Sequence, residues 1–251
     1  MSGHSKWHNI QGKKGVEDAK RGRIFTKVTR EIIIAAKAGG GNSDTNTRLR
    51  AALEKAKSAG MPSDNIKKAI MRGTGEMEGV TYEETTYEGY GPNGTAFIIQ
   101  ASTDNKNRTT SEIRRILLQH GGALGENGSV SWCFERRGSL DIDPGERNYD
   151  DLFMLAVDSG AEDLKQEDET TTVFTAPDEV YKVRQALEAA GITVKSASLV
   201  MIPKTLVAVA IEDARKVARL EEALEEHDDI SDYFSNCEMS DEVIKQLEQE
   251  N

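Results

Sequence analysis

The chain has 251 residues, 37% of them hydrophobic, with a formal net charge of −11 at pH 7 and a pI near 5.0. This length exceeds one ordinary domain and predicts two or three. No apolar run approaches the ~18 residues of a membrane span, and the N-terminus lacks the apolar segment of a secretory signal. The two cysteines, Cys133 and Cys237, form no CxxC pair, so neither a zinc ligand set nor a disulfide framework is indicated. We therefore expect a cytoplasmic protein.

The charge is distributed unevenly along the chain. Residues 1–73 contain sixteen Lys or Arg and six Asp or Glu, a net charge of +10, which leaves −21 for residues 74–251. A basic segment on an acidic body predicts a polyanion partner, most commonly a phosphate backbone, because each neutralised phosphate releases counterions. The alternative is a solvated Lys-rich surface, which is less favoured because helices prefer mixed charge pairs.

The basic segment has the periodicity of three helices. Residues 1–14 are polar and Gly-punctuated, and we expect a poorly ordered arm anchored by Trp7. Over residues 16–38 one face carries apolar side chains: Ile24, Phe25, Val28, Ile32, Ala35 and Ala36. The opposite face carries Lys20, Arg23, Lys27, Arg30 and Lys37, with Ile34 among them as an exposed residue. Glycines 39–41 end this helix, and helices over 46–59 and 62–73 complete a small bundle.

Strands and helices alternate after residue 76. Two strands at 85–90 and 95–102 are joined by a turn at 91–94. A helix over 109–120 is predicted to begin at a capping box formed by Thr109 and Glu112. A strand over 129–136 then alternates through Val130, Trp132 and Phe134.

Residues 138–202 contain a β-α-β-β-α-β series, the split pattern of ferredoxin-like folds. Its members are expected at 139–142, 149–159, 161–166, 171–175, 178–190 and 193–200. A strand at 206–211, a helix at 213–226 and a strand at 230–237 have no partners of their own, so they are expected to complete the sheet begun before residue 137. The predicted fold class is α+β: an N-terminal three-helix bundle plus two ferredoxin-like α+β domains, one inserted in the other. The expected domains are 1–78, 79–137 with 203–240, and the insert 138–202.

Residues that could carry chemistry are few. Residues 89–94 match G-x-G-x-x-G, but a dinucleotide site needs a helix after the motif, whereas Pro92 and Asn93 predict a turn. His4 and His8 are spaced i, i+4 without a third ligand, so no metal site is predicted. The polar loop 104–109 could bind an anion at a helix N-terminus, but turn and capping chemistry is favoured. His120 is expected to cap carbonyls and His227 to pair with an acidic residue. We predict no catalytic residue and no cofactor.

Several motifs resemble those of the YebC family. They are residues 3–7, the basic helix 13–27, 35–37 with the glycine cap 39–41, 46–50, 61–62 with 65–66, 87–92 and 103–105. The resemblance covers essentially the whole chain; Asn42-Ser43 stands where Asp-Pro is expected, and Lys106 where Arg is usual. It implies a cytosolic, non-enzymatic protein of three domains, one helical and two α+β. Members have been assigned as DNA-binding transcriptional regulators, mitochondrial relatives support translation, and bacterial relatives have been linked to ribosomes at proline-rich sequences.

Two functions are therefore weighed. A DNA-binding transcriptional regulator agrees with the family assignment. A ribosome- or rRNA-bound translation factor, supporting elongation through proline-rich sequences, agrees better with the charge, because a body of −21 would be repelled by long duplexes. An enzyme is a third alternative, disfavoured for lack of a site. We expect a monomer without membrane contact. The residues predicted to bind nucleic acid are Lys6, Trp7, Lys13, Lys14, Lys20, Arg21, Arg23, Lys27, Arg30, Lys37, Arg48 and Arg50.

Overall fold

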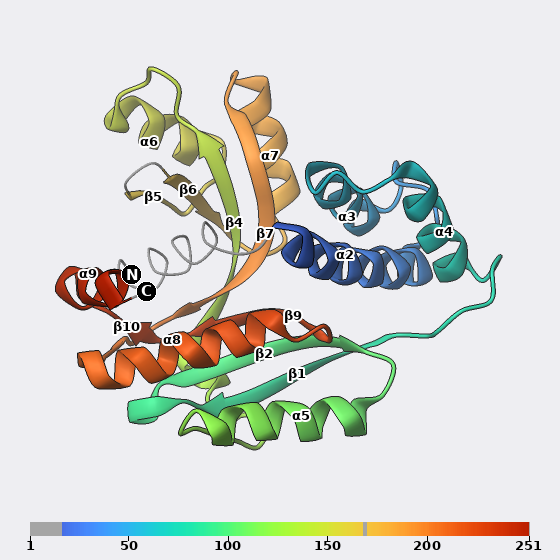
Figure 1. Ribbon diagram of the computed structural model, residues 1–251. Helices are drawn as coiled ribbons and strands as arrows, with labels where there is room; N and C mark the ends of the chain where they lie inside the picture. Colours follow the sequence, from blue (N-terminus) through green and yellow to red (C-terminus); the bar gives the residue numbers. More distant parts are fainter. Residues whose placement is uncertain (1–16, 168–169, 251) are drawn as a thin grey trace. The chain divides into compact units, whose positions relative to one another are not determined.

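The computed structural model describes residues 17–167 and 170–250 (Figure 1). The chain separates into two compact units. The first unit combines Met1–Ser131 with Leu206–Asn251, and the second is Trp132–Thr205. The second unit is thus an insertion in the first. Its boundaries lie six residues before and three residues after the insert expected from the sequence, 138–202.

Three helices of the first unit form a bundle, as the sequence predicts. They are α2 (Glu17–Gly39), α3 (Thr47–Ser58) and α4 (Ser63–Thr74). Asn46 fastens α3 to α2, because its Oδ1 accepts from the Leu49 backbone N–H and its amide donates to the Ala35 carbonyl at 2.8 Å. Gly73 allows α4 to approach α2 closely: a Cβ at this position would lie 2.5 Å from the Ile33 carbonyl oxygen. The bundle core contains Val28, Ile32, Ile33, Ala35, Ala36, Leu49, Ala52, Ala56, Met61 and Ala69.

Two apolar positions of α2 differ from the expectation. Ile34, expected to be exposed, is only 8% exposed, and Ile24, expected to be buried, is 39% exposed. Helix α2 is contacted by α3 and α4 and also, through Arg23, Lys27 and Arg30, by the segment 225–229. Its buried arc is therefore wider than one apolar stripe, and the sequence of α2 alone does not reveal the second contact.

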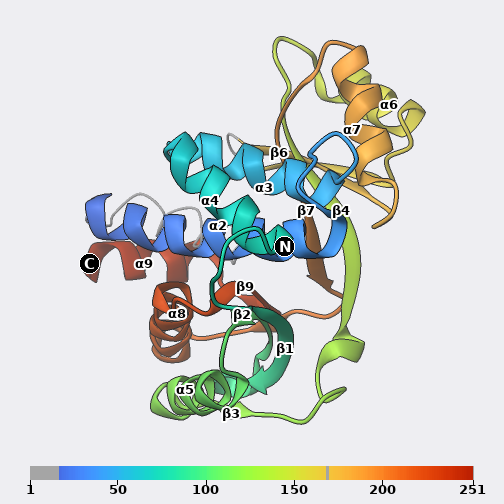
Figure 2. The same cartoon turned by 90° about the vertical axis from the view of Figure 1, so that its right-hand side faces the viewer.

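The rest of the first unit is a four-stranded antiparallel sheet covered by two helices. The strands are β1 (Glu83–Tyr90), β2 (Ala96–Thr103), β3 (Ala123–Leu124) and β9 (Ile230–Ser235), in the order β3-β1-β2-β9. Helices α5 (Lys106–Gln119) and α8 (Ile211–Glu226) lie on the same face of the sheet (Figure 2). The turn Pro92–Gly94 joins β1 to β2, as expected, with Asn93 at φ 56°. Strands β8 (Val207–Ala208) and β10 (Cys237–Glu238) form a small parallel pair, and α9 (Asp241–Glu250) ends the described chain.

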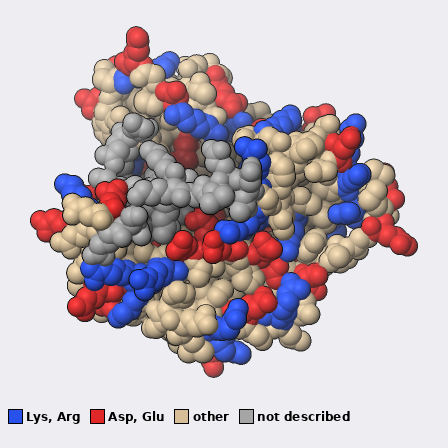
Figure 3. All heavy atoms as spheres, in the orientation of Figure 1, with Lys and Arg blue, Asp and Glu red and all other residues tan. Residues whose placement is uncertain are grey.

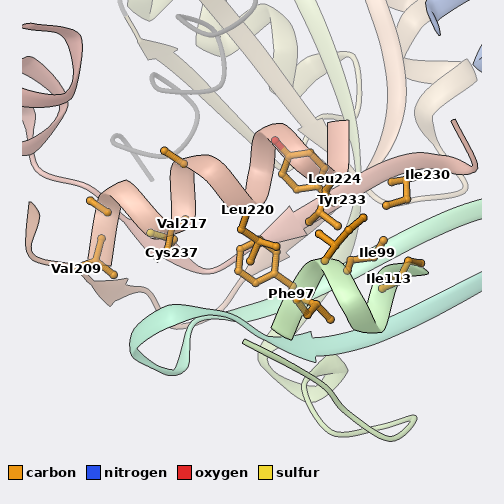
Figure 4. Packing of buried hydrophobic residues seen from close by; sticks show 14 of the residues in the cluster. Phe97, Ile99, Ile113, Val209, Val217, Leu220, Leu224, Ile230, Tyr233 and Cys237 are labelled. Carbon is orange, nitrogen blue, oxygen red and sulfur yellow. The ribbon is translucent and has the colours of Figure 1, made fainter. Parts of the chain in front are cut away.

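The core of this sheet layer is centred on Phe97. Its side chain is fully buried and points from β2 toward α8, where Leu220 lies beside it (Figure 4). Ile99, Ile113 and Leu224 extend the same cluster. Gly91 is required next to this ring, because a Cβ there would lie 2.5 Å from Cε2 of Phe97. The core therefore combines strands from residues 83–103 with a helix and strand from residues 211–235.

The second unit is the β-α-β-β-α-β series predicted from the sequence. Its strands are β4 (Phe134–Asp143), β5 (Asp163–Glu167), β6 (Thr170–Thr175) and β7 (Thr193–Pro203), in the order β5-β6-β4-β7. Its helices are α6 (Tyr149–Asp158) and α7 (Val180–Ala189). Leu140, Leu152, Val173 and Leu187 are central to its core. The predicted fold class, a helical bundle plus two α+β parts with one inserted in the other, is confirmed.

Several of the element boundaries predicted from the sequence were wrong. The strands expected at 129–136 and 139–142 are a short 3-10 turn, Ser131–Cys133, followed by the single strand β4. Gly138 suggests a break, yet it is needed inside the strand, since a Cβ there would lie 2.2 Å from Oγ1 of Thr175. Trp132 lies in the turn and is 71% exposed. The strand expected at 206–211 is shorter and contains only β8, because α8 already begins at Ile211. Helix α9 was not predicted.

The insertion leads to a prediction about independent folding. The two ends of the second unit lie side by side, because the Lys204 N–H donates to the Cys133 carbonyl at 2.8 Å. Deleting residues 132–205 and joining Ser131 to Leu206 through a short Gly linker should therefore leave a remainder that unfolds in one cooperative urea transition. Cutting after Arg137 instead would divide β4 and should not give a clean excision. A broad, non-cooperative transition of the first variant would show that the first unit depends on the second.

Candidate nucleic-acid interface

The basic face of α2 contacts an acidic segment of its own chain. This segment, residues 225–229, connects α8 to β9. Arg23 forms an ion pair with Glu226 at 2.7 Å, and Nζ of Lys27 donates to the Glu225 carbonyl at 2.7 Å. Burial lowers the pKa of Lys27, although the nearby carboxylates of Glu225, Asp232 and Asp228 oppose this shift. Two of the cations predicted to meet phosphate thus already have protein partners.

Arg30 is held more tightly than the other two. Its Nη1 lies 2.7 Å from Oδ1 of Asp229 and also donates to the carbonyls of Asp228, at 2.6 Å, and Ser102, at 3.2 Å. The guanidinium lies over the ring of Tyr82, 5.1 Å from its centroid, and the side chain is only 13% exposed. The expectation that Arg30 faces solvent was therefore wrong. An Arg30→Glu change would place a second carboxylate against Asp229.

Asp229 joins the bundle to the sheet layer. Its Oδ2 accepts hydrogen bonds from Arg108 at 2.6 Å, from Thr109 Oγ1 at 2.6 Å and from Thr103 Oγ1 at 3.2 Å. Burial alone would raise the pKa of this carboxyl. The hydrogen bonds from Thr109 and Arg108, with the charges of Arg30 and Arg108, outweigh burial and lower the pKa to about 2. Asp229 is therefore ionised and fully paired.

The polar loop before α5 has a structural role. Asn105, not Thr109, caps the helix: its side chain accepts from the Arg108 N–H at 3.1 Å. Thr109 lies one turn further and is buried against Thr103 and Asp229. The loop therefore does cap the helix, but the predicted capping box of Thr109 and Glu112 was wrong, because the helix begins three residues earlier than expected. The local sequence contained the signal, since Asn is as good a cap as Thr.

A cluster of possible metal ligands lies beside this network. Glu112, His227 and Asp229 bring their ligand atoms within 4.8 Å of one another. These atoms are already engaged: His227 Nε2 lies 3.0 Å from Glu112, its Nδ1 accepts the Asp229 N–H, and Asp229 pairs with two guanidinium groups. Two adjacent positive charges would repel a cation. The sequence predicts that His227 pairs with an acidic residue, and in the structure this residue is Glu112.

The other predicted site residues have varied environments. Lys6, Trp7, Lys13 and Lys14 lie outside the described residues, as does the side chain of Lys20. Arg48 forms an ion pair with Glu84, and Arg50 donates to the carbonyls of Ser43 and Asp44. Arg21 and Lys37 are exposed. Of the predicted set, therefore, only Arg21 and Lys37 are both described and unpaired with another described residue.

Sequence reasoning overlooked the cations of the neighbouring helix. Lys67, Lys68 and Arg72 of α4 are exposed and form no ion pair with another described residue. Lys and Arg spheres are visible over α4 at the right of Figure 3. Lys37 of α2 is also exposed and lies where α2 and α4 cross, since a Cβ at Gly73 would lie 3.2 Å from its backbone nitrogen. We call Lys37, Lys67, Lys68 and Arg72 the α4 surface. The signal was present, since Ile66, Ala69 and Ile70 pointing inward forces the intervening lysines outward.

The fold and charge separation define a class of protein: a basic helical bundle carried by two acidic α+β parts. No helix among the described residues is long and apolar enough to cross a membrane. The chain belongs to the TACO1/YebC family. Residues 5–76 match the model of the TACO1/YebC protein N-terminal domain, and residues 82–237 match that of the TACO1/YebC second and third domain.

Curated relatives and a solved structure agree with this family. A probable transcriptional regulatory protein of Dictyoglomus turgidum is 51% identical over 248 residues, 98% of this chain and 100% of its own length. A protein of the same name from Thermotoga maritima is 49% identical over 248 residues, 98% of each chain. The crystal structure of a conserved hypothetical protein from Aquifex aeolicus is 43% identical with a TM-score of 0.84, covering 91% of this chain and 95% of that one. The names of the two curated relatives indicate a family of regulators.

Proposed function

We propose that this protein is a non-enzymatic regulator that binds nucleic acid through its helical bundle, with DNA as the first target. The observation that carries the proposal is the exposed cationic α4 surface on a segment of net charge +10. Phosphate neutralisation by such a surface supplies affinity without sequence preference. The names of the relatives support transcription as the regulated process. A cytoplasmic location and a monomeric state are part of this proposal.

A second candidate is a ribosome-bound translation factor. The charge outside the bundle, −21 over residues 74–251, favours it. On a long duplex this charge would meet further phosphates, whereas on a ribosome it could face basic proteins. Sedimentation with ribosomes, compared with a gel shift on duplex DNA, distinguishes the two candidates.

Charge reversal on the α4 surface tests whether this surface binds nucleic acid, which both candidate functions require. The variant Lys67→Glu, Lys68→Glu, Arg72→Glu should remain folded, because exposed substitutions usually change stability by about 0.5 kcal/mol or less. Its affinity for a 30-bp duplex should fall by at least about tenfold. The slope of log K against the logarithm of the salt concentration should become less negative by about three, one for each lost cation.

A control variant separates location from net charge. The control makes the same change in net charge at exposed positions of α5: Lys106→Glu, Arg114→Glu, Arg115→Glu. It should bind within about threefold of the unmodified protein. Equal losses in both variants would mean that only net charge matters, and no loss in either would contradict the proposed interface.

A further inference from the structure

We propose that the segment 225–229 is an intramolecular competitor of nucleic acid, which occupies the basic face of α2 and holds the protein in a state of lower affinity. This proposal rests on the proposed function and concerns the regulation of the same bundle. We call Arg23, Lys27 and Arg30 the α2 face.

The segment presents four carbonyl or carboxylate oxygens to the α2 face. Arg23 and Arg30 are seven residues apart, so the α2 face extends over about 10 Å of helix. Along this length it meets the Glu226 carboxylate, the Glu225 and Asp228 carbonyls and the Asp229 carboxylate. A duplex carries one charge per about 1.7 Å of axis and could satisfy the same three cations. The two partners are therefore mutually exclusive on this face.

The contact leaves these cations incompletely satisfied. Lys27 is paired with a neutral carbonyl, and the Arg23–Glu226 pair is about half exposed, with side-chain exposures of 39% and 54%. Nε of Arg30 is buried without a hydrogen-bond partner. Phosphate oxygens, each charged and able to accept several bonds, would satisfy such donors more fully.

The bundle can separate from the segment without opening either core. The bundle core and the sheet-layer core share no residue among those described. The connection between them, residues 75–82, is mostly exposed. The contacts of Arg23 and Lys27 with the segment are polar and partly exposed, so a polyanion weakens them by competition and by screening, whereas the buried Arg30–Asp229 pair is screened much less. Regulation requires only this separation, because the α4 surface is already exposed and can make the first contact.

Neutralising three acids of the segment tests the proposal; Glu226 and Asp228 are exposed, and Glu225 is half-buried. The variant is Glu225→Gln, Glu226→Gln, Asp228→Asn, read out by fluorescence anisotropy of a labelled 20-bp duplex at 100 mM NaCl. Asp229 is left unchanged, because the fold depends on it. The matched control, Glu222→Gln, Glu242→Gln, Glu248→Gln, removes the same charge from exposed positions of α8 and α9. We expect the segment variant to bind at least five times more tightly and the control to stay within twofold.

A second arm identifies the face that is released. Arg23→Glu with Lys27→Glu should weaken the segment variant by more than tenfold but the unmodified protein by less than threefold. Hydrogen exchange of residues 225–229 in the unmodified protein should also rise when duplex is added. Equal gains in the segment variant and its control, an unchanged affinity of the segment variant, or exchange that stays constant on binding would overturn the proposal.

These outcomes are separable from those of the proposed function. If charge reversal on the α4 surface abolishes binding while the segment variant binds like the unmodified protein, the competitor does not exist and the nucleic-acid function stands. If neither the unmodified protein nor the segment variant binds duplex, both ideas fail. If only the segment variant binds, the competitor is established directly.

Discussion

Replacing Asp229 with Asn is expected to lower the free energy of unfolding at pH 7 by roughly 3–5 kcal/mol, the usual cost of breaking a buried ion pair. The change leaves Arg30 and Arg108 without their common carboxylate and removes an acceptor from Thr109. Urea unfolding followed by circular dichroism measures the loss. Asp228→Asn is the control: this neighbour is exposed and uses its backbone carbonyl, so the change should cost about 0.5 kcal/mol or less.

The same carboxylate gives a pH dependence with a defined sign. The pKa of Asp229 is lowered in the folded protein to about 2, from an ordinary value of 3.8. A carboxyl with a lowered folded pKa binds fewer protons in the folded state, so its stabilisation is complete above about pH 4 and is lost as pH falls toward 2. The stability difference between the unmodified protein and Asp229→Asn should therefore narrow between pH 4 and pH 2. A difference that is constant over this range would mean that the carboxylate charge is not what stabilises the network.

Truncation of Phe97 is the second change with a large expected effect. Phe97→Ala should cost roughly 3–5 kcal/mol, because it empties the centre of a core built from β2, α5 and α8. Phe25→Ala removes the same atoms from a residue that only partly packs against the bundle core, so it should cost clearly less. The sequence suggests an equal loss for Phe25, since both residues lie on apolar faces. Equal measured losses in urea unfolding would show that the burial of the two rings does not differ in solution.

Mutations that test nucleic-acid binding by the basic segment are better placed on the α4 surface than on α2. Substituting Lys27 or Arg30 alters a contact within the protein as well as any contact with nucleic acid. A binding loss in such a variant is therefore ambiguous. The α4 surface gives an unambiguous result, because its cations have no described ion-pair partner whose loss would disturb the fold.

Sequence alone determined most of the elements, though not all of their boundaries, and the charge separation. Hydrophobic periods of 3.6 and 2 predicted the three bundle helices and the alternating strands and helices of the insert, because these periods reflect which side chains one local element can bury. The unpartnered strand and helix after residue 203 predicted that they complete an earlier sheet, and β9 indeed pairs with β2. The family resemblance followed from local motifs in the same way.

Only the tertiary structure decided which cations are available. Helical spacing correctly placed Arg23, Lys27 and Arg30 on one face of α2, but spacing cannot show what lies opposite that face. The partners, Glu225, Glu226 and Asp229, are about 200 residues away in the chain and reach α2 only because β9 joins the sheet beside β2. Local periodicity reports the energy of one element, whereas ion pairing depends on contacts between elements. The candidate site therefore moved from the outer face of α2 to the α4 surface.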